Sequence, residues 1–199
     1  VDKDRVGIAG FCVGASFALI AASGESIRDK VDFIHAFGPY FDMTKLVGDI
    51  ASSSQSSEDS RLPWKVDPLT YEIFVKALTK HLGSKEAMYL QTYFIEGKTE
   101  TVFPMSMLSA EGHTIYQLLK GVPAQTVDQH INKLPETLLN QFDQLSPRLY
   151  IKDLQAPVHL MHDREDPLIP SAHSRQLARS LNPNTTRYTE FLMFQHMDP

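Results

Sequence analysis

The apolar positions of the chain predict strands near both ends and helices between them. Near the start, a short apolar run over residues 6–9 leads into a second run, residues 11–22, which has the length of a helix. A further apolar run, Val31–Phe37, has the length of a buried strand. The first part of the chain therefore predicts a strand, a helix and a second strand.

The middle of the chain has a different character. Residues 51–60 (ASSSQSSEDS) are polar and rich in serine, which predicts an exposed loop. From there to about Leu154, helix signals follow one another almost without a strand. Asp67 and Pro68 provide an N-cap and a proline at the first helical position. We expect helices over residues 68–82, 84–97, 110–120, 123–133 and 135–145.

The last part of the chain returns to the pattern of the first. Val158 to Met161 predict a strand, residues 172–181 a helix and residues 186–194 a final strand. Strands that alternate with helices indicate an α/β fold, with a parallel sheet and right-handed crossovers.

The first strand and helix join at Gly10-Phe11-Cys12-Val13-Gly14, which is the pattern of a nucleophile elbow with cysteine in the place of the more usual serine. In such a sharp turn we expect Gly10 and Gly14 to leave space that Cβ atoms would fill. A helix N-terminus stabilises negative charge on Cys12, and the N–H of Val13 is then an oxyanion donor. The alternative is a chance tight turn that holds a structural cysteine.

An acid and a histidine follow in the order expected of a catalytic triad. Asp166 lies in the polar loop after the strand that begins at Val158, and His196 follows the last strand. The order nucleophile, acid, histidine is that of α/β-hydrolases, whereas chymotrypsin-like and subtilisin-like enzymes use other orders. Asp166 could instead cap a turn, Asp163 or Glu165 could replace it, and His196 could be a solvated histidine. For the remaining histidines, which lack paired metal-ligand spacing, we expect surface or core positions: His35, His81, His113, His130, His159, His162 and His173.

On three segments, DRVGIAGFCVGAS, APVHLMHDREDPLIP and FQHMDP, the chain resembles the C-terminal part of an α/β-hydrolase. Its cysteine elbow is similar to that of dienelactone hydrolases, although Ala15 stands where they usually carry a further glycine. The acid loop of the family has the form His-Gly-x-x-Asp-x-x-Val-Pro, which residues 162–170 match except at Asp163 and Ile169. The resemblance implies that Asp166 is the triad acid.

The resemblance also implies a domain organisation. Residues 1–41 and 155–199 would form the C-terminal half of the sheet of an α/β-hydrolase fold, flanked by helices, and residues 42–154 an inserted helical cap or lid. The family places several strands before its elbow, and one of their loops supplies the second oxyanion donor. We therefore expect this stretch to lack the N-terminal strands and to be inactive alone.

The reaction that the resemblance implies is hydrolysis of a carboxylic ester or lactone through an acyl-cysteine. Cys12 would attack the carbonyl carbon, His196 would transfer the proton, and Asp166 would orient the imidazole. Neither a metal nor an organic cofactor is implied. A thioesterase, an acyltransferase or a non-catalytic binding protein of the same fold are the alternatives.

The composition of the chain limits the classes of molecule that it is expected to bind. The 199 residues include 42% hydrophobic residues and carry a net charge of −5, without clustered lysine or arginine, which argues against nucleic acid as the main partner. No apolar run is long enough to span a bilayer, and the single cysteine excludes an internal disulfide and a cysteine-rich metal site. We expect a small ester or lactone as the partner; oligomeric state stays open, and the cytoplasm is the default compartment.

Large apolar residues of the middle block are expected in the core of the cap: Trp64, Phe94, Phe103, Met105 and Met107.

Overall fold

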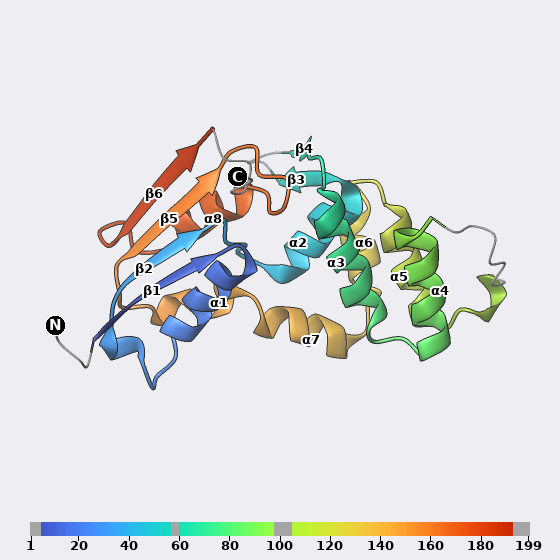
Figure 1. The fold of residues 1–199 in the computed structure, drawn as a ribbon, viewed down its shortest axis with the longest axis horizontal. Helices are drawn as coiled ribbons and strands as arrows, with labels where there is room; N and C mark the ends of the chain where they lie inside the picture. Colours follow the sequence, from blue (N-terminus) through green and yellow to red (C-terminus); the bar gives the residue numbers. More distant parts are fainter. Residues whose placement is uncertain (1–4, 57–59, 98–104, 193–199) are drawn as a thin grey trace. The chain divides into compact units, whose positions relative to one another are not determined.

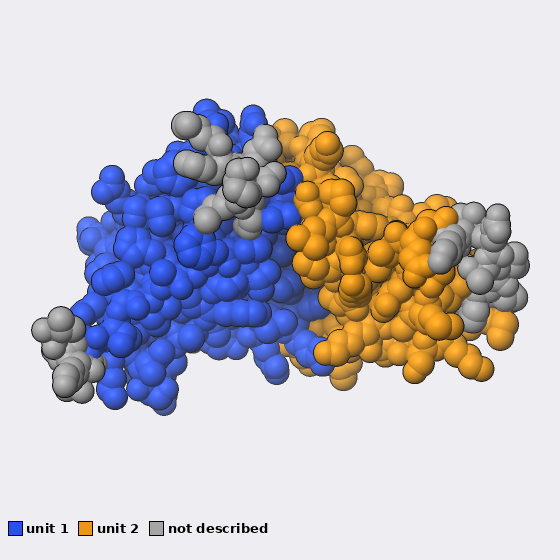
Figure 2. Space-filling view, in the orientation of Figure 1, with its two compact units in different colours: residues 1–46, 141–199 blue, residues 47–140 orange. Residues whose placement is uncertain are grey.

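A computed structural model of the chain describes residues 5–56, 60–97 and 105–192 (Figure 1). The chain divides into two compact units, coloured separately in Figure 2. Unit 1 consists of residues 1–46 and 141–199, and unit 2 of residues 47–140.

Unit 1 is built on a four-stranded sheet in which all neighbouring strands are parallel. The strand order is β1-β2-β5-β6. The strands span Val6–Phe11 (β1), Val31–Phe37 (β2), Val158–Asp163 (β5) and Thr186–Phe191 (β6). Helix α1 (Val13–Ala22) follows β1, and α8 (Ala172–Ser180) connects β5 to β6; short 3-10 turns cover Arg28–Lys30, Pro147–Leu149 and Ile151–Asp153. The expected α/β fold, with a parallel sheet flanked by helices, is confirmed.

The core of unit 1 lies on one face of this sheet. Leu19 of α1 and Leu177 of α8 pack with Ile34 of β2 and Leu160 of β5, and all four side chains are fully buried. Burying a side chain of this size contributes about 1.5–3 kcal/mol. Both helices therefore cover the same face of the sheet. Because side chains alternate along a strand, the opposite face carries Phe33, which is 46% exposed.

The carboxyl ends of the strands share one edge of the sheet, since all four strands are parallel. Backbone hydrogen bonds continue the pairing past this edge into the loops. The N–H groups of Cys12, Gly38 and Arg164 donate to the carbonyls of Phe37 (2.8 Å), Met161 (2.8 Å) and Phe191 (2.9 Å). The segments after β1, β2 and β5 are thereby fixed to neighbouring strands.

The boundaries of unit 1 differ from the sequence-based segments 1–41 and 155–199. Residues 141–154 belong to unit 1 because they bond to the segment after β2. The Tyr40 hydroxyl donates to the Leu145 carbonyl at 2.8 Å, and the Arg148 N–H donates to the Phe41 carbonyl at 3.1 Å. Arg148 also forms an ion pair with Asp42, with Nε and Oδ2 2.7 Å apart.

Unit 2 is mainly helical, as the sequence predicts for this part of the chain. Its helices are α3 (Pro68–Thr79), α4 (Ser84–Ile95), α5 (Ala110–Lys120) and α6 (Val127–Ile131), with a 3-10 turn over Met105–Met107. The Asp67 side chain caps α3 as predicted, because its Oδ1 accepts the N–H of Leu69 at 2.7 Å. Helices α2 (Met43–Ser52) and α7 (Glu136–Gln144) each continue from one unit into the other.

The expectation of an exposed loop over residues 51–60 is wrong for the residues that the structure describes. Residues 51 and 52 end α2, and β3 (Ser54–Ser56) pairs with β4 (Arg61–Pro63) in an antiparallel hairpin. Arg61 holds this hairpin in place: it forms an ion pair with the fully buried Asp49 and donates to Ser54 Oγ at 2.8 Å. A buried arginine–carboxylate contact thus orders a polar segment whose local sequence favours a loop.

Candidate functional site

The Cys12 turn, residues 10–14, connects β1 directly to α1. Cys12 lies between the last residue of the strand and the first residue of the helix, and its side chain is partly exposed. Its φ is 55° and its ψ −134°, a backbone conformation that costs a residue other than glycine about 1–3 kcal/mol. Strained backbone of this kind is concentrated at functional sites, which makes Cys12 a candidate nucleophile.

The two glycines of the turn have different reasons to be there. A Cβ on Gly10 would lie 2.6 Å from the Gly14 carbonyl oxygen and 2.7 Å from Ala15 Cα, so the turn can close only around a glycine. A Cβ on Gly14 would meet no atom within 4 Å among the described residues. The expectation of crowding is therefore confirmed at Gly10 and wrong at Gly14.

The start of α1 is fixed to the segment after β2. Ser16 Oγ accepts the Tyr40 N–H at 2.9 Å and lies 3.1 Å from the Tyr40 carbonyl oxygen, to which it donates. Burial raises the pKa of the Tyr40 hydroxyl well above its ordinary value, and negative charge on Cys12 raises it further. Val13 opens the helix, and the first N–H groups of a helix have no acceptor within it. The Val13 N–H is thus suited to donate a hydrogen bond to an oxyanion formed at Cys12.

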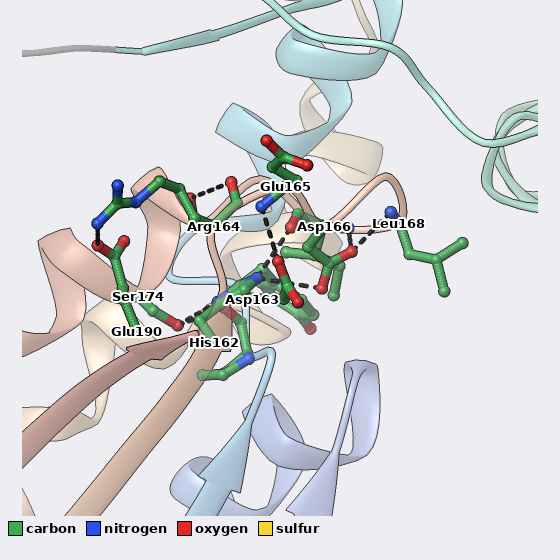
Figure 3. Close-up of polar contacts among 12 residues, drawn as sticks. His162, Asp163, Arg164, Glu165, Asp166, Leu168, Ser174 and Glu190 are labelled. Carbon is green, nitrogen blue, oxygen red and sulfur yellow. Dashed lines mark hydrogen bonds and ion pairs between the residues drawn. The ribbon is translucent and has the colours of Figure 1, made fainter. Parts of the chain in front are cut away.

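The Asp166 loop, residues 164–170, follows β5 at the same edge of the sheet (Figure 3). The carboxylate of Asp166 is buried, and its Oδ1 accepts the N–H groups of Leu168 at 2.7 Å and Ile169 at 3.0 Å. Its Oδ2 lies 3.2 Å from Nε2 of His162. Asp166 therefore caps the turn of its own loop, which was the alternative to a catalytic role. Its position after β5 is also the one that the sequence pattern predicts for a triad acid.

His162 fixes the base of this loop from within the protein. Its side chain is fully buried; Nε2 lies 2.9 Å from the Ile169 carbonyl oxygen and Nδ1 lies 2.6 Å from Ser174 Oγ. Since a carbonyl oxygen only accepts, Nε2 of His162 is the donor to the Ile169 carbonyl. Both nitrogens of His162 are thus used in holding β5, α8 and the loop together.

The two alternative acids differ in their surroundings. Asp163 is buried, and its Oδ1 accepts the Glu165 N–H at 2.9 Å. The Glu165 side chain is exposed to solvent. A triad acid needs a fixed orientation relative to its histidine, so burial favours Asp166 and Asp163 over Glu165.

A second charged cluster borders the loop. Arg164 lies near Glu190 of β6, with Nη2 and Oε2 3.6 Å apart, and Arg175 of α8 donates to Glu190 Oε1 at 2.7 Å. Burial acts to raise the pKa of Glu190, but hydrogen bonds from Tyr188 and Arg175 and the charges of both arginines outweigh it, so that the pKa is lowered. Glu190 is thus held as a carboxylate beside the loop.

The structure brings some of the predicted site residues to one edge and leaves one outside its range. Cys12, Val13 and Asp166 all follow the carboxyl ends of strands, and β2 alone separates β1 from β5. His196 lies outside the described residues. The sequence analysis did not predict that His162 and Ser174 support the loop. The position of His162, first in the segment that resembles the acid loop of α/β-hydrolases, could have indicated its role.

No group of three or more His, Cys, Asp or Glu side chains suited to a metal ion occurs within residues 5–56, 60–97 and 105–192. In the same part of the chain, no helix has both the length and the apolar character needed to cross a membrane.

Known proteins offer distant likenesses in structure only. No family model and no curated protein matches the sequence. The meta-cleavage product hydrolase CumD of Pseudomonas fluorescens IP01 is 16% identical over 94% of this chain and 56% of its own, with a TM-score of 0.42. The α/β-hydrolase enzyme MGS-M2 from a Medee basin deep-sea metagenome library is 12% identical over 96% of this chain and 57% of its own, with a TM-score of 0.45.

A third solved structure, the acylaminoacyl peptidase of Pyrococcus horikoshii, is 14% identical over 96% of this chain and 19% of its own, with a TM-score of 0.45. The chain thus spans little more than half the length of the first two proteins and a smaller share of the third. With identities this low and TM-scores below 0.5, functional inference depends on the geometry of the chain itself.

Proposed function

We propose that this chain belongs to an α/β-hydrolase of the dienelactone hydrolase type, which cleaves a carboxylic ester or lactone through an acyl-cysteine. The observation that carries the proposal is the backbone of Cys12. A cysteine at φ 55°, between a parallel strand and the helix that follows it, has the geometry of a nucleophile elbow. A buried structural cysteine has no need of a strained, partly exposed position.

Each step of the reaction has a residue assigned to it. His196 takes the proton of the Cys12 thiol, the thiolate attacks the carbonyl carbon, and the Val13 N–H donates to the oxyanion that forms. The carbon–oxygen bond of the ester breaks, and His196 gives a proton to the departing alkoxide. Water then attacks the thioester, His196 takes a proton from it, and the carboxylic acid leaves as Cys12 is restored.

Asp166 is assigned to orient His196 and to stabilise its positive charge. Two backbone N–H groups hold Oδ1, so the direction of the carboxylate is fixed before a histidine binds to it. Oδ2 already lies 3.2 Å from His162, and a carboxylate oxygen can accept from a second donor. This preorganisation is what a triad acid requires.

Unit 2 is assigned the role of a lid. The chain leaves the sheet after β2 and returns to it at β5, and these two strands are neighbours. The segment between them is thus an insertion into the crossover that runs from the carboxyl end of β2 to the amino end of β5. Insertions of this kind exclude water and limit the size of the substrate.

The proposal is tested on the full-length protein with p-nitrophenyl acetate and with iodoacetamide. We expect Cys12→Ala and His196→Ala each to lower kcat/KM by about 100-fold or more, whereas His113→Ala, at an exposed position on α5, leaves it unchanged. Cys12 is the single cysteine of these 199 residues, and mapping the iodoacetamide label by mass spectrometry separates it from any other cysteine of the full-length protein. His196→Ala should slow this labelling, and mass spectrometry should find the acetyl group on Cys12.

Two results would contradict the proposal. Hydrolysis that survives Cys12→Ala would exclude an acyl-cysteine. An absence of turnover, together with labelling of Cys12 no faster than in the unfolded chain, would mean that the elbow is structural, and a non-catalytic binding role would replace the enzymatic one.

A further inference from the structure

Unit 2 holds a pocket of its own, with a volume of about 630 Å³. All of its lining residues lie between residues 47 and 140, so it is a property of this unit alone. The volume falls within the range of about 300–1,000 Å³ that is usual for small-molecule sites.

The walls of the pocket are apolar. Ile50 and Ala51 of α2 and Leu118 of α5 are buried, and Trp64, the single tryptophan of the chain, is 7% exposed. The Tyr71 hydroxyl donates to the Leu119 carbonyl at 2.7 Å, and burial raises the pKa of Tyr71, which keeps this wall neutral. An occupant would therefore be in contact mainly with hydrocarbon and aromatic surface.

Backbone hydrogen bonds hold these walls in position. The Trp64 N–H donates to the Ser53 carbonyl and the Val122 N–H donates to the Ala51 carbonyl, both at 2.9 Å. The end of α2 is thus bonded both to the segment that carries Trp64 and to the segment after α5. A pocket whose walls are already fixed loses little entropy when it binds a ligand.

The charged residues of the lining share one sign. Lys65 and Lys120, both exposed to solvent, line the pocket, and the lining contains neither aspartate nor glutamate among the residues that the structure describes. Neither lysine forms an ion pair with another residue in the described part of the chain. Two cations beside an apolar wall favour a ligand with a negative charge and a hydrocarbon body.

We propose that this pocket binds a small amphiphilic anion, with its apolar body against Trp64, Val66 and Tyr71 and its anionic group beside Lys65 and Lys120. This site does not depend on the role proposed for Cys12. Replacement of Cys12 by alanine should therefore leave its affinity unchanged.

The test uses decanoate, with decanol as the neutral molecule of the same chain length. Trp64 is the reporter, because it is the only tryptophan of these 199 residues and forms part of the wall. We expect decanoate to change its emission in a saturable way with one site per chain, and each methylene removed from the carboxylate to weaken binding about fourfold. Isothermal titration calorimetry on the same samples gives a readout that does not depend on fluorescence.

Lysine variants test the charge. Lys65→Met and Lys120→Met should each weaken decanoate binding about threefold at low salt, and the effect should shrink as salt is added. Lys76→Met is the matched control, because Lys76 is exposed, pairs with Glu72 and does not line the pocket. Decanol should bind more weakly than decanoate and should not respond to the lysine variants.

Two outcomes would overturn the proposal. In one, neither fluorescence nor calorimetry detects saturable binding by the folded protein. In the other, decanoate and decanol bind equally and the Lys65 and Lys120 variants behave like Lys76→Met. Circular dichroism of each variant confirms that a loss of binding is not a loss of the fold.

Discussion

The Cys12 turn and the Asp166 loop lie at the same edge of one sheet, yet they are held by different forces. At the Cys12 turn, the backbone is constrained by contact: Gly10 lies against the backbone of Gly14 and Ala15, and Cys12 is held at a positive φ. At the Asp166 loop, the backbone is constrained by polar side chains, with the Asp166 carboxylate and the His162 ring as partners of its N–H and carbonyl groups.

This difference decides what each region tolerates. A steric constraint responds to volume and is insensitive to charge, so the turn should depend on the size of the residue at position 10. A buried polar network responds to the loss of any partner, because the remaining groups are left without hydrogen bonds. Substitutions and pH can therefore separate the two.

The largest effect is expected from Asp166→Ala. The substitution leaves the N–H groups of Leu168 and Ile169 without their acceptor and removes the neighbour of His162 Nε2. We expect a loss of about 3 kcal/mol in the free energy of unfolding, measured by urea denaturation. Glu165→Ala, at an exposed position of the same loop, should change it by less than about 0.5 kcal/mol. Equal losses for the two variants would mean that the carboxylate network does not hold the loop.

A pair of glycine substitutions tests the Cys12 turn. Gly10→Ala should cost about 2 kcal/mol, since its Cβ would meet three backbone atoms at 2.6–2.8 Å that cannot move without distorting the turn. Gly14→Ala places a methyl group where no described atom lies within 4 Å, and it should be neutral or slightly stabilising in the first turn of α1. The comparison of their urea midpoints checks this, and a similar cost at both positions would contradict a steric origin.

A smaller effect, with a defined pH dependence, is expected from Glu190→Gln. The pKa of Glu190 is lowered in the folded protein, so its carboxylate stabilises the fold above the ordinary glutamate pKa of about 4.3, and this contribution is lost as the pH falls through the lowered value. The variant should lose about 1 kcal/mol at neutral pH and converge with the wild type in more acidic solution. The effect of Gly10→Ala should not change over the same range. Urea unfolding midpoints measured at neutral pH and in acidic solution check this. A Glu190→Gln effect independent of pH would be inconsistent with the lowered pKa.

Local sequence patterns were sufficient for the elements with strong terminal signals. Asp67 and Pro68 predicted the start of α3, and residues 110–120 were predicted as a helix and form α5. The pattern failed at α6, which begins at Val127 rather than at Pro123, and at the hairpin β3–β4. The hairpin depends on a contact between Arg61 and Asp49, which are twelve positions apart, and a pattern read over neighbouring positions does not contain such a contact.

The sequence by itself determined the α/β alternation, the strand-to-helix turn at Cys12 and the need for glycine at position 10, because each depends on periodicity or on the covalent geometry of a few adjacent residues. Only the tertiary structure decided that α1 and α8 cover one face of the sheet, that His162 supports the Asp166 loop, and that Trp64 lines a pocket with Lys65 and Lys120. These features arise from side chains that are distant in sequence and meet only when the chain is packed, and their burial and hydrogen bonding depend on that packing.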